Sequence, residues 1–555
     1  MHQLTIQQTF DLALQHQNAG RLQRAEQLYR QVLVREPEHI DALHNLGAIA
    51  HRVGRNDVAV NLLRRAVALR PDLPGTHVTL GLALKDHGQI DEAIAAYREA
   101  ISLKPGLPEA HNNLGIALSA KEQFDEAIVA YQHAIALRAD YGEAYCNLGN
   151  AMKDQERFGE AIAAYRAAIA RRPGLAEAHY NLGIALMNQR QLDDAIIAYQ
   201  NAIARKPNFP EAYGNLGNAL RDKGLIDQAI EVYRRAIALQ PEFAQAHTNL
   251  AFALLLRGDF RQGWEEYEWR WEWKEFPLTS SKFVQPQWDG SDPGNRTILL
   301  HPEQGLGDTI QFIRYATLVS ERGGKVIFCC HPELWRLLQG FPGIEKCVRP
   351  GEMFPRFDFH CPLLSLPRAF QTTLESIPAK VPYLCLDPKL VELWQNRLAA
   401  CSRGFKVGLV WAGSPRKQND RHRSMKLADL VPLMQLPGAR FFSLQKGAAA
   451  AQVRTLPEGT ELADWTTELT DFADTAALIA NLDLVISVDT AVAHLAGAMG
   501  KAVWTLLPFA PDWRWLLNRD DSPWYPTMRL FRQPSAGDWA AVIARVVDAM
   551  RHHLG

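Results

Sequence analysis

Three short polar motifs in the C-terminal half of the sequence carry residue types suited to anion binding and proton transfer. The first is Glu303-Gln-Gly-Leu-Gly-Asp308. Gly305 and Gly307 allow a ligand to approach the backbone closely, and Asp308 is suited to take a proton from a hydroxyl group. Asp308 is equally suited to cap a following helix. The motif therefore leaves two roles open for this carboxylate, general base and helix cap.

The second motif is basic and runs from Ser414 to Ser424. It contains five residues that carry or can acquire positive charge: Arg416, Lys417, Arg421, His422 and Arg423. Cations grouped in this way suit a diphosphate, and we expect Ser414, Lys417, Arg421 and Arg423 to contact it. The alternative is a solvated basic loop with no ligand.

The third motif, Ser487-Val-Asp-Thr-Ala-Val-Ala-His494, places polar residues where a helix is expected to begin. Free N–H groups and the helix dipole attract anions at such a position. Asp489 would repel phosphate, so we expect it to hold the hydroxyl groups of a ribose or sugar beside Thr490. His494, one helical turn further on, either contacts the ligand or is a hydrogen-bonded core residue.

Short apolar runs precede these motifs and predict the strands that position them. Strands are expected at 297–301, 325–330, 406–411, 439–444, 482–487 and 501–507, with helices at 310–319, 334–338 and 491–499. This alternation predicts two Rossmann-like lobes built from parallel βαβ units. Ligands bind beyond the carboxyl ends of such strands, and all three motifs fall there.

The N-terminal half repeats itself with a fixed period of about 34 residues. Gly47, Gly81, Gly115 and their successors lie inside helical patterns, where glycine costs up to ~1 kcal/mol relative to alanine. Because successive repeats accept the cost of a glycine inside a helix, we expect the glycine to provide a compensating gain. We expect this gain to be the close approach of neighbouring helices. Alanines, tyrosines and closing prolines recur in phase with the glycines. The pattern predicts about seven and a half helical pairs that stack into an α-solenoid.

One position of the repeat is usually asparagine. Equivalent positions of a stacked solenoid form a row, and a row of amides can bind the backbone of an extended peptide. The alternative is a solvated groove. The last unit instead gathers tryptophans between Trp264 and Trp273, which we expect to pack against the following domain. The predicted ladder comprises Asn113, Asn147, Asn181, Asn215 and Asn249, with Asn45 at the same position of an earlier unit.

Composition excludes several classes of protein. The 60 basic and 61 acidic residues nearly cancel, so no general attraction to nucleic acid is expected. The sequence contains no apolar run long enough to predict a membrane span, and its first twenty residues lack the pattern of a secretory signal. Seven cysteines without a C-x-x-C pair argue against a disulfide framework or a zinc site. The expected location is cytoplasmic.

The repeated half resembles the tetratricopeptide repeat, and its asparagine ladder is similar to that of O-GlcNAc transferases. Residues 296–535 resemble glycosyltransferases of the heptosyltransferase type, which have the GT-B fold. That likeness rests on Gly307-Asp308-Thr309 and on Asp489-Thr490 with His494-Leu-Ala. It implies that Asp308 is the base and that Asp489, Thr490 and His494 contact a nucleotide-sugar donor. Two departures put heptose in doubt as the sugar: Gln311 follows where a proline is usual, and the tail Pro511-Asp-Trp-Arg-Trp is atypical.

These observations predict a glycosyltransferase that moves a sugar from a nucleotide-sugar donor to an acceptor, which we expect to be a protein held by the repeats. We expect an inverting reaction without a cofactor. We also expect no metal ion to be needed, because no D-x-D pair is present to hold a divalent ion. Two alternatives stay open: a non-catalytic scaffold whose α/β half is vestigial or senses nucleotides, and transfer to a glycan or lipid. The expected division is a repeat array at 1–275, a linker at 276–295, a first lobe at 296–400 and a donor-binding lobe with a closing helix at 401–555.

Overall fold

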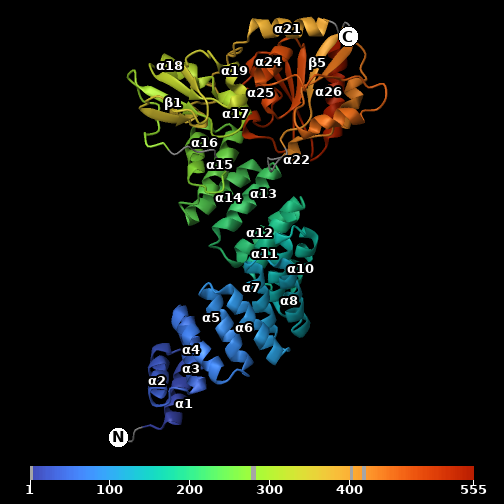
Figure 1. Cartoon of the computed structure of the whole chain (residues 1–555). Coiled ribbons are helices and arrows are strands. Elements are labelled where there is room, and N and C mark those ends of the chain that lie inside the picture. The colour runs from blue at the N-terminus through green and yellow to red at the C-terminus, as the bar shows by residue number, and fades with distance from the viewer. Residues whose placement is uncertain (1–3, 277–282, 400–403, 415–419, 555) are drawn as a thin grey trace. The chain divides into compact units, whose positions relative to one another are not determined.

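The computed structural model describes residues 4–276, 283–399, 404–414 and 420–554, without the side chains of residues 421 and 422. The chain forms two compact units, residues 1–219 and 220–555. We describe each unit by itself (Figure 1).

The first unit is built from antiparallel helical pairs, as the period of the sequence predicts. Its helices are nearly equal in length and alternate with short turns. They are α1 (Ile6–Asn18), α2 (Leu22–Arg35), α3 (Ile40–Arg52), α4 (Asn56–Leu69), α5 (Pro74–Asp86), α6 (Ile90–Leu103), α7 (Pro108–Ala120), α8 (Phe124–Leu137), α9 (Gly142–Asp154), α10 (Phe158–Arg171), α11 (Ala176–Asn188), α12 (Leu192–Arg205) and α13 (Pro210–Asp222), the last of which ends beyond the boundary at residue 219.

The recurring glycine allows the two helices of a pair to approach closely. A Cβ atom on Gly81 would lie 2.5 Å from the ring of Tyr97, and one on Gly115 would lie 2.5 Å from Tyr131. Both tyrosines are buried. The expected gain from glycine is confirmed, because a tyrosine ring occupies the space that a side chain would need.

The second unit begins with the end of the helical array. Helices α14 (Ile226–Leu239), α15 (Ala244–Arg257) and α16 (Phe260–Tyr267) lead into a short 3-10 helix, η1 (Glu268–Trp271). Trp264 is 2% exposed, its indole N–H donates to the carbonyl of Thr372, and its ring meets that of Trp513 edge-on. The prediction that the aromatic last repeat packs against the following domain is confirmed for Trp264, whereas Trp269 stacks on His247 of the helical array.

The first lobe contains a parallel sheet in the order β3-β2-β1-β4. Its strands are β1 (Thr297–His301), β2 (Lys325–Cys329), β3 (Lys346–Val348) and β4 (Phe359–Pro362), and its helices are α17 (Leu306–Phe312), α18 (Tyr315–Glu321), α19 (Trp335–Leu338) and α20 (Leu366–Ala369). The prediction of a single helix at 310–319 is wrong. This segment is divided between α17 and α18, and the Arg314 side chain donates to the carbonyl of Gln311 where they meet.

The second lobe contains a parallel sheet in the order β10-β9-β8-β5-β6-β7. The strands are β5 (Phe405–Val410), β6 (Ala439–Ser443), β7 (Ala463–Asp464), β8 (Leu484–Val488), β9 (Val503–Leu507) and β10 (Met528–Arg532). The helices are α21 (Pro388–Ala399), α22 (Asp420–Arg423), α23 (Val431–Met434), α24 (Phe472–Ala480), α25 (Ala491–Ala498) and α26 (Trp539–Leu554).

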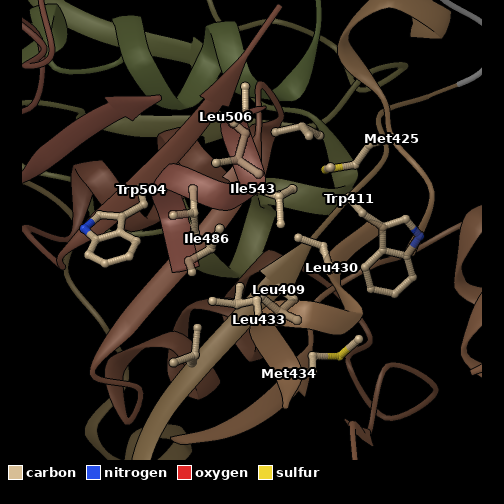
Figure 2. Packing of buried hydrophobic residues seen from close by; sticks show 14 of the residues in the cluster. Leu409, Trp411, Met425, Leu430, Leu433, Met434, Ile486, Trp504, Leu506 and Ile543 are labelled. Carbon is tan, nitrogen blue, oxygen red and sulfur yellow. The ribbon is translucent and has the colours of Figure 1, made fainter. Parts of the chain in front are cut away.

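Buried apolar side chains fill the space between this sheet and its helices. Leu409 of β5, Ile486 of β8 and Leu506 of β9 pack with Leu433 of α23 and Ile543 of α26 (Figure 2). This core supports the carboxyl ends of β5 and β8, where two of the three polar motifs begin. Among the described residues, no helix is long and apolar enough to cross a membrane.

Candidate active site

Asp308 lies at the first turn of α17, directly after β1, and both of its carboxylate oxygens have partners. Oδ2 accepts the backbone N–H of Gly305 at 2.9 Å, which is the helix-capping role. Oδ1 accepts a hydrogen bond from Nη2 of Arg514, a residue of the second lobe. The side chain is 11% exposed. Capping therefore occupies only one oxygen, and the other faces the opposite lobe.

Arg514 lies in a short 3-10 helix, η6 (Trp513–Trp515), that follows β9. Its Nη1 donates to Asp512 at 2.8 Å and its Nε donates to Oε1 of Gln311 at 2.9 Å. Burial by itself would lower the pKa of Arg514, but the carboxylates of Asp512 and Asp308 outweigh burial and raise it. A permanent cation is thus buried between carboxylates from both lobes.

Asp489 and Thr490 occupy the corner between β8 and α25. Burial and the nearby Asp512 carboxylate raise the pKa of Asp489, while Arg423 and Arg514 act in the opposite direction. The hydroxyl of Thr490 is 2.9 Å from that of Ser487, and Thr490 does not cap α25 with its side chain. The first backbone N–H groups of α25 therefore have no side-chain cap from Thr490.

His494 connects the two motifs. Its Nδ1 is 3.0 Å from the hydroxyl of Tyr525, its ring stacks on Trp515, and its Nε2 lies 3.9 Å from Asp489 Oδ1. Gly307 lies so close that an added Cβ would come within 2.9 Å of the imidazole. Helix α17 of the first lobe and helix α25 of the second therefore pack directly on each other (Figure 1).

The basic motif reaches the same corner through Arg423. Its Nη1 donates to the backbone carbonyl of Asp489 at 3.1 Å, and its Nε donates to Asp420 at 3.2 Å. Ser414 is exposed at the end of the segment after β5. Lys417 and the side chain of Arg421 lie outside the described residues.

Three asparagines of the ladder donate hydrogen bonds to side chains of the preceding repeat. Asn147 donates to Asn112, Asn181 to Asn150 and Asn215 to the hydroxyl of Tyr180, each at 3.0 Å. The side chains of Asn113, Asn147, Asn181 and Asn215 are half-buried, whereas Asn249 is only 6% exposed.

A pocket of about 520 Å³ lies within the second unit. It is lined by Ile226 and Arg257 from the end of the helical array and by the turn from Leu516 to Asp521. The same turn follows Arg514, so the pocket and the carboxylate cluster share one segment of chain.

Sequence reasoning missed Arg514, Gln311, Trp515 and Tyr525 as partners of the motifs. The tail Pro511-Asp-Trp-Arg-Trp and Gln311 both depart from the family pattern, but these departures do not indicate which residues they contact. Tyr525 meets His494 and Arg514 meets Asp308 only through pairings between distant segments of the sequence, which no local pattern encodes.

The fold and site define an α-solenoid of tetratricopeptide repeats joined to an α/β region of the GT-B type. Models of the tetratricopeptide repeat match residues 10–74, 146–210 and 198–231, and a further TPR repeat model matches 81–121, 117–155 and 217–258. The model of glycosyltransferase family 9 (heptosyltransferase) matches residues 402–511. The chain therefore contains tetratricopeptide repeats and, at residues 402–511, a glycosyltransferase family 9 (heptosyltransferase) domain.

Relatives match parts of the chain. Protein FlbA of Caulobacter vibrioides is 30% identical over 324 residues, which are 54% of this chain and 53% of FlbA, so the chain spans about half the length of this curated relative. A crystal structure of MamA is 31% identical, with a TM-score of 0.29, over 30% of this chain and 97% of MamA. YrrB, described as a TPR protein with an unusual peptide-binding site, is 22% identical, with a TM-score of 0.30, over 33% of this chain and 95% of YrrB.

Proposed function

We propose that the protein transfers a sugar from a nucleotide-sugar donor to a hydroxyl group of an acceptor. The observation that carries the proposal is the meeting of two motifs: Asp308 follows β1 and Asp489 follows β8. His494 links them, because it lies 3.9 Å from Asp489 and packs against Gly307, the residue before Asp308. The carboxyl ends of parallel strands are where α/β folds bind ligands. The family 9 match over residues 402–511 supports a sugar donor at this edge.

In the proposed reaction Asp308 is the general base. It removes the proton of the acceptor hydroxyl while that oxygen bonds to the anomeric carbon, and the nucleoside diphosphate leaves with the electron pair of the broken C–O bond. Attack from the face opposite the leaving group inverts the anomeric centre. Asp308 is suited to this role because each of its carboxylate oxygens accepts one hydrogen bond, from Gly305 or from Arg514, and retains a second lone pair for the acceptor hydroxyl.

The donor corner would bind the nucleotide sugar through Asp489, Thr490 and His494, with Gly305 and Gly307 giving close backbone approach. The backbone N–H groups at the start of α25 would stabilise the departing diphosphate. Ser414, Lys417, Arg421 and Arg423 would provide further donors and positive charge. We propose that this cation-rich corner replaces a metal ion.

The acceptor is proposed to be a protein segment bound by the repeats. Each ladder amide that donates to its neighbour retains a second N–H and carbonyl lone pairs for a peptide backbone. Asn113, Asn147, Asn181 and Asn215 suit this role, while the burial of Asn249 favours a packing role. Binding the acceptor on the same chain as the site raises its effective concentration.

The test is transfer from a panel of nucleotide sugars to co-expressed proteins, read by intact-protein mass spectrometry. Transfer by the parent and its loss in Asp308→Asn, with donor binding retained, would support the proposal. A parent that folds and binds partners but transfers nothing and hydrolyses no donor would favour the scaffold. Sugar found on glycans or lipids instead of proteins would favour the third possibility.

A further inference from the structure

The contacts of Arg514 hold its side chain in one position. The side chain is 6% exposed, and its guanidinium donates to Asp308 and Gln311 of the first lobe and to Asp512 of its own lobe. The same group lies 4.3 Å from the ring centre of Trp513. Three polar partners and an aromatic face leave the planar guanidinium little freedom to rotate.

The chain after Arg514 is held in a strained conformation. Leu516 has φ 55°, a region that costs of order 1–3 kcal/mol for a residue other than glycine. Arg532 of β10 fixes this turn, because its guanidinium donates to the carbonyls of Trp515, Leu516 and Arg519 at 2.6, 2.9 and 3.0 Å. Strain that the half-buried Arg532 maintains with three hydrogen bonds indicates that the turn must keep its shape.

We propose that Arg514 is the positioning residue for Asp308, fixing the carboxylate of the first lobe in register with the donor corner of the second. The inference rests on the proposed function. Gly305 N–H holds Oδ2 and Arg514 holds Oδ1, so the plane of the carboxylate is set by one bond from each lobe. The anomeric carbon of a donor bound at Asp489 would then meet a base whose position was already determined.

Gln311 extends this arrangement by one residue. Its Oε1 must face Arg514, because Nε of arginine can only donate, and this assigns the orientation of the amide. Its Nε2 is buried without a hydrogen-bond partner among the described residues. A buried unpaired donor is costly, so Gln311 stands at a site where leucine would pack without that cost. Holding Arg514 explains its presence.

The experiment compares Arg514→Lys with Arg314→Lys. Arg314 is a matched control: it is equally buried and also joins the lobes, through the carbonyl of Trp524, but it does not bond Asp308. Lysine retains the charge and loses the planar fork. Steady-state kinetics would be measured with the donor that the parent uses, together with the melting temperature of each variant.

For Arg514→Lys we expect kcat to fall ~100-fold with the donor KM within about threefold of the parent, since misplacing a reacting group by about 1 Å has an effect of this size. Arg314→Lys should lower the melting temperature similarly but leave kcat within about threefold. Adding methylguanidinium to Arg514→Ala should restore part of kcat, and methylammonium should restore less.

Three results would overturn the inference: unchanged kcat in Arg514→Lys, an equal loss of kcat in Arg314→Lys, or a rise in donor KM alone. If the parent transfers no sugar from any donor, the proposed function fails first, and that outcome is distinct because it appears without any substitution.

Discussion

His301, at the end of β1, makes the second unit sensitive to acid. The side chain is 5% exposed, and its Nε2 lies 3.2 Å from Nδ1 of His360 in β4. Burial, and then the neighbouring His360, lower the pKa of His301 from 6.5 to about 3. A histidine with a lowered folded-state pKa destabilises the fold as the pH falls below the unfolded-state value, because only the unfolded chain takes up the proton.

The size of the effect follows from these two values. A pH of 5 is about 1.5 units below the ordinary pKa of histidine, so the imidazole of the unfolded chain is almost fully protonated. The imidazole of the folded chain is still neutral at this pH. Each pKa unit corresponds to about 1.4 kcal/mol, so lowering the pH from 7.5 to 5 decreases the free energy of unfolding by about 2 kcal/mol. The loss continues until the pH reaches the folded-state pKa near 3.

The measurement is urea unfolding of the full chain, monitored by tryptophan fluorescence. All 14 tryptophans lie at or beyond Trp264, so the signal reports on the second unit alone. His301→Gln can still donate to His360 but cannot titrate. Between pH 7.5 and 5 we expect the variant to lose about 2 kcal/mol less unfolding free energy than the parent, which is the linkage contribution of one imidazole. Equal losses in the two proteins would refute the reasoning.

Three further predictions concern packing and the site. Gly81→Ala should destabilise the repeats by about 1–3 kcal/mol in far-ultraviolet circular dichroism, because its Cβ would meet Tyr97 at 2.5 Å, whereas Gly106→Ala, with open space around it, should not. Trp264→Ala should lower the unfolding free energy of the second unit by about 3–5 kcal/mol; a loss under about 1 kcal/mol would contradict its role in the shared core. Gly307→Ala should push α17 away from His494 and abolish most sugar transfer, and full activity would show that this contact is dispensable.

The repeats could be predicted from sequence because each depends on contacts between neighbouring helices. Glycine, alanine and tyrosine recur at fixed spacing, and the ring of Tyr97 in α6 meets Gly81 in α5, the helix directly before it. Strands β1, β2, β5, β6, β8 and β9 were also predictable from apolar runs, whereas β3, β7 and β10 were missed. Strand β4 was not expected, because Phe359–Pro362 combines a histidine, a cysteine and a proline and is stabilised by pairing with β1.

The site was predictable in part. The rule that ligands bind at the carboxyl ends of strands led us to expect Asp308 and Asp489 in one region, and the structure links their motifs through Gly307 and His494. Arg514 could not be found in this way, because 206 residues separate it from Asp308 and the pairing exists only once the two lobes are packed. The helix expected at 310–319 was wrong for a related reason, since the side chain of Arg314 competes for a backbone carbonyl.

The junction between the helical array and the first lobe has a consequence for anyone who divides this protein. Arg270 of η1 is fully buried and forms two hydrogen bonds to Glu303, which is itself fully buried beside β1. A recombinant fragment starting at residue 276 would leave Glu303 without its cation, a defect that typically costs about 3–5 kcal/mol. A fragment starting at Leu220 keeps the pair. The final helical pair therefore belongs structurally with the α/β half. To exchange the solenoid between relatives, the chain should be cut upstream of this pair.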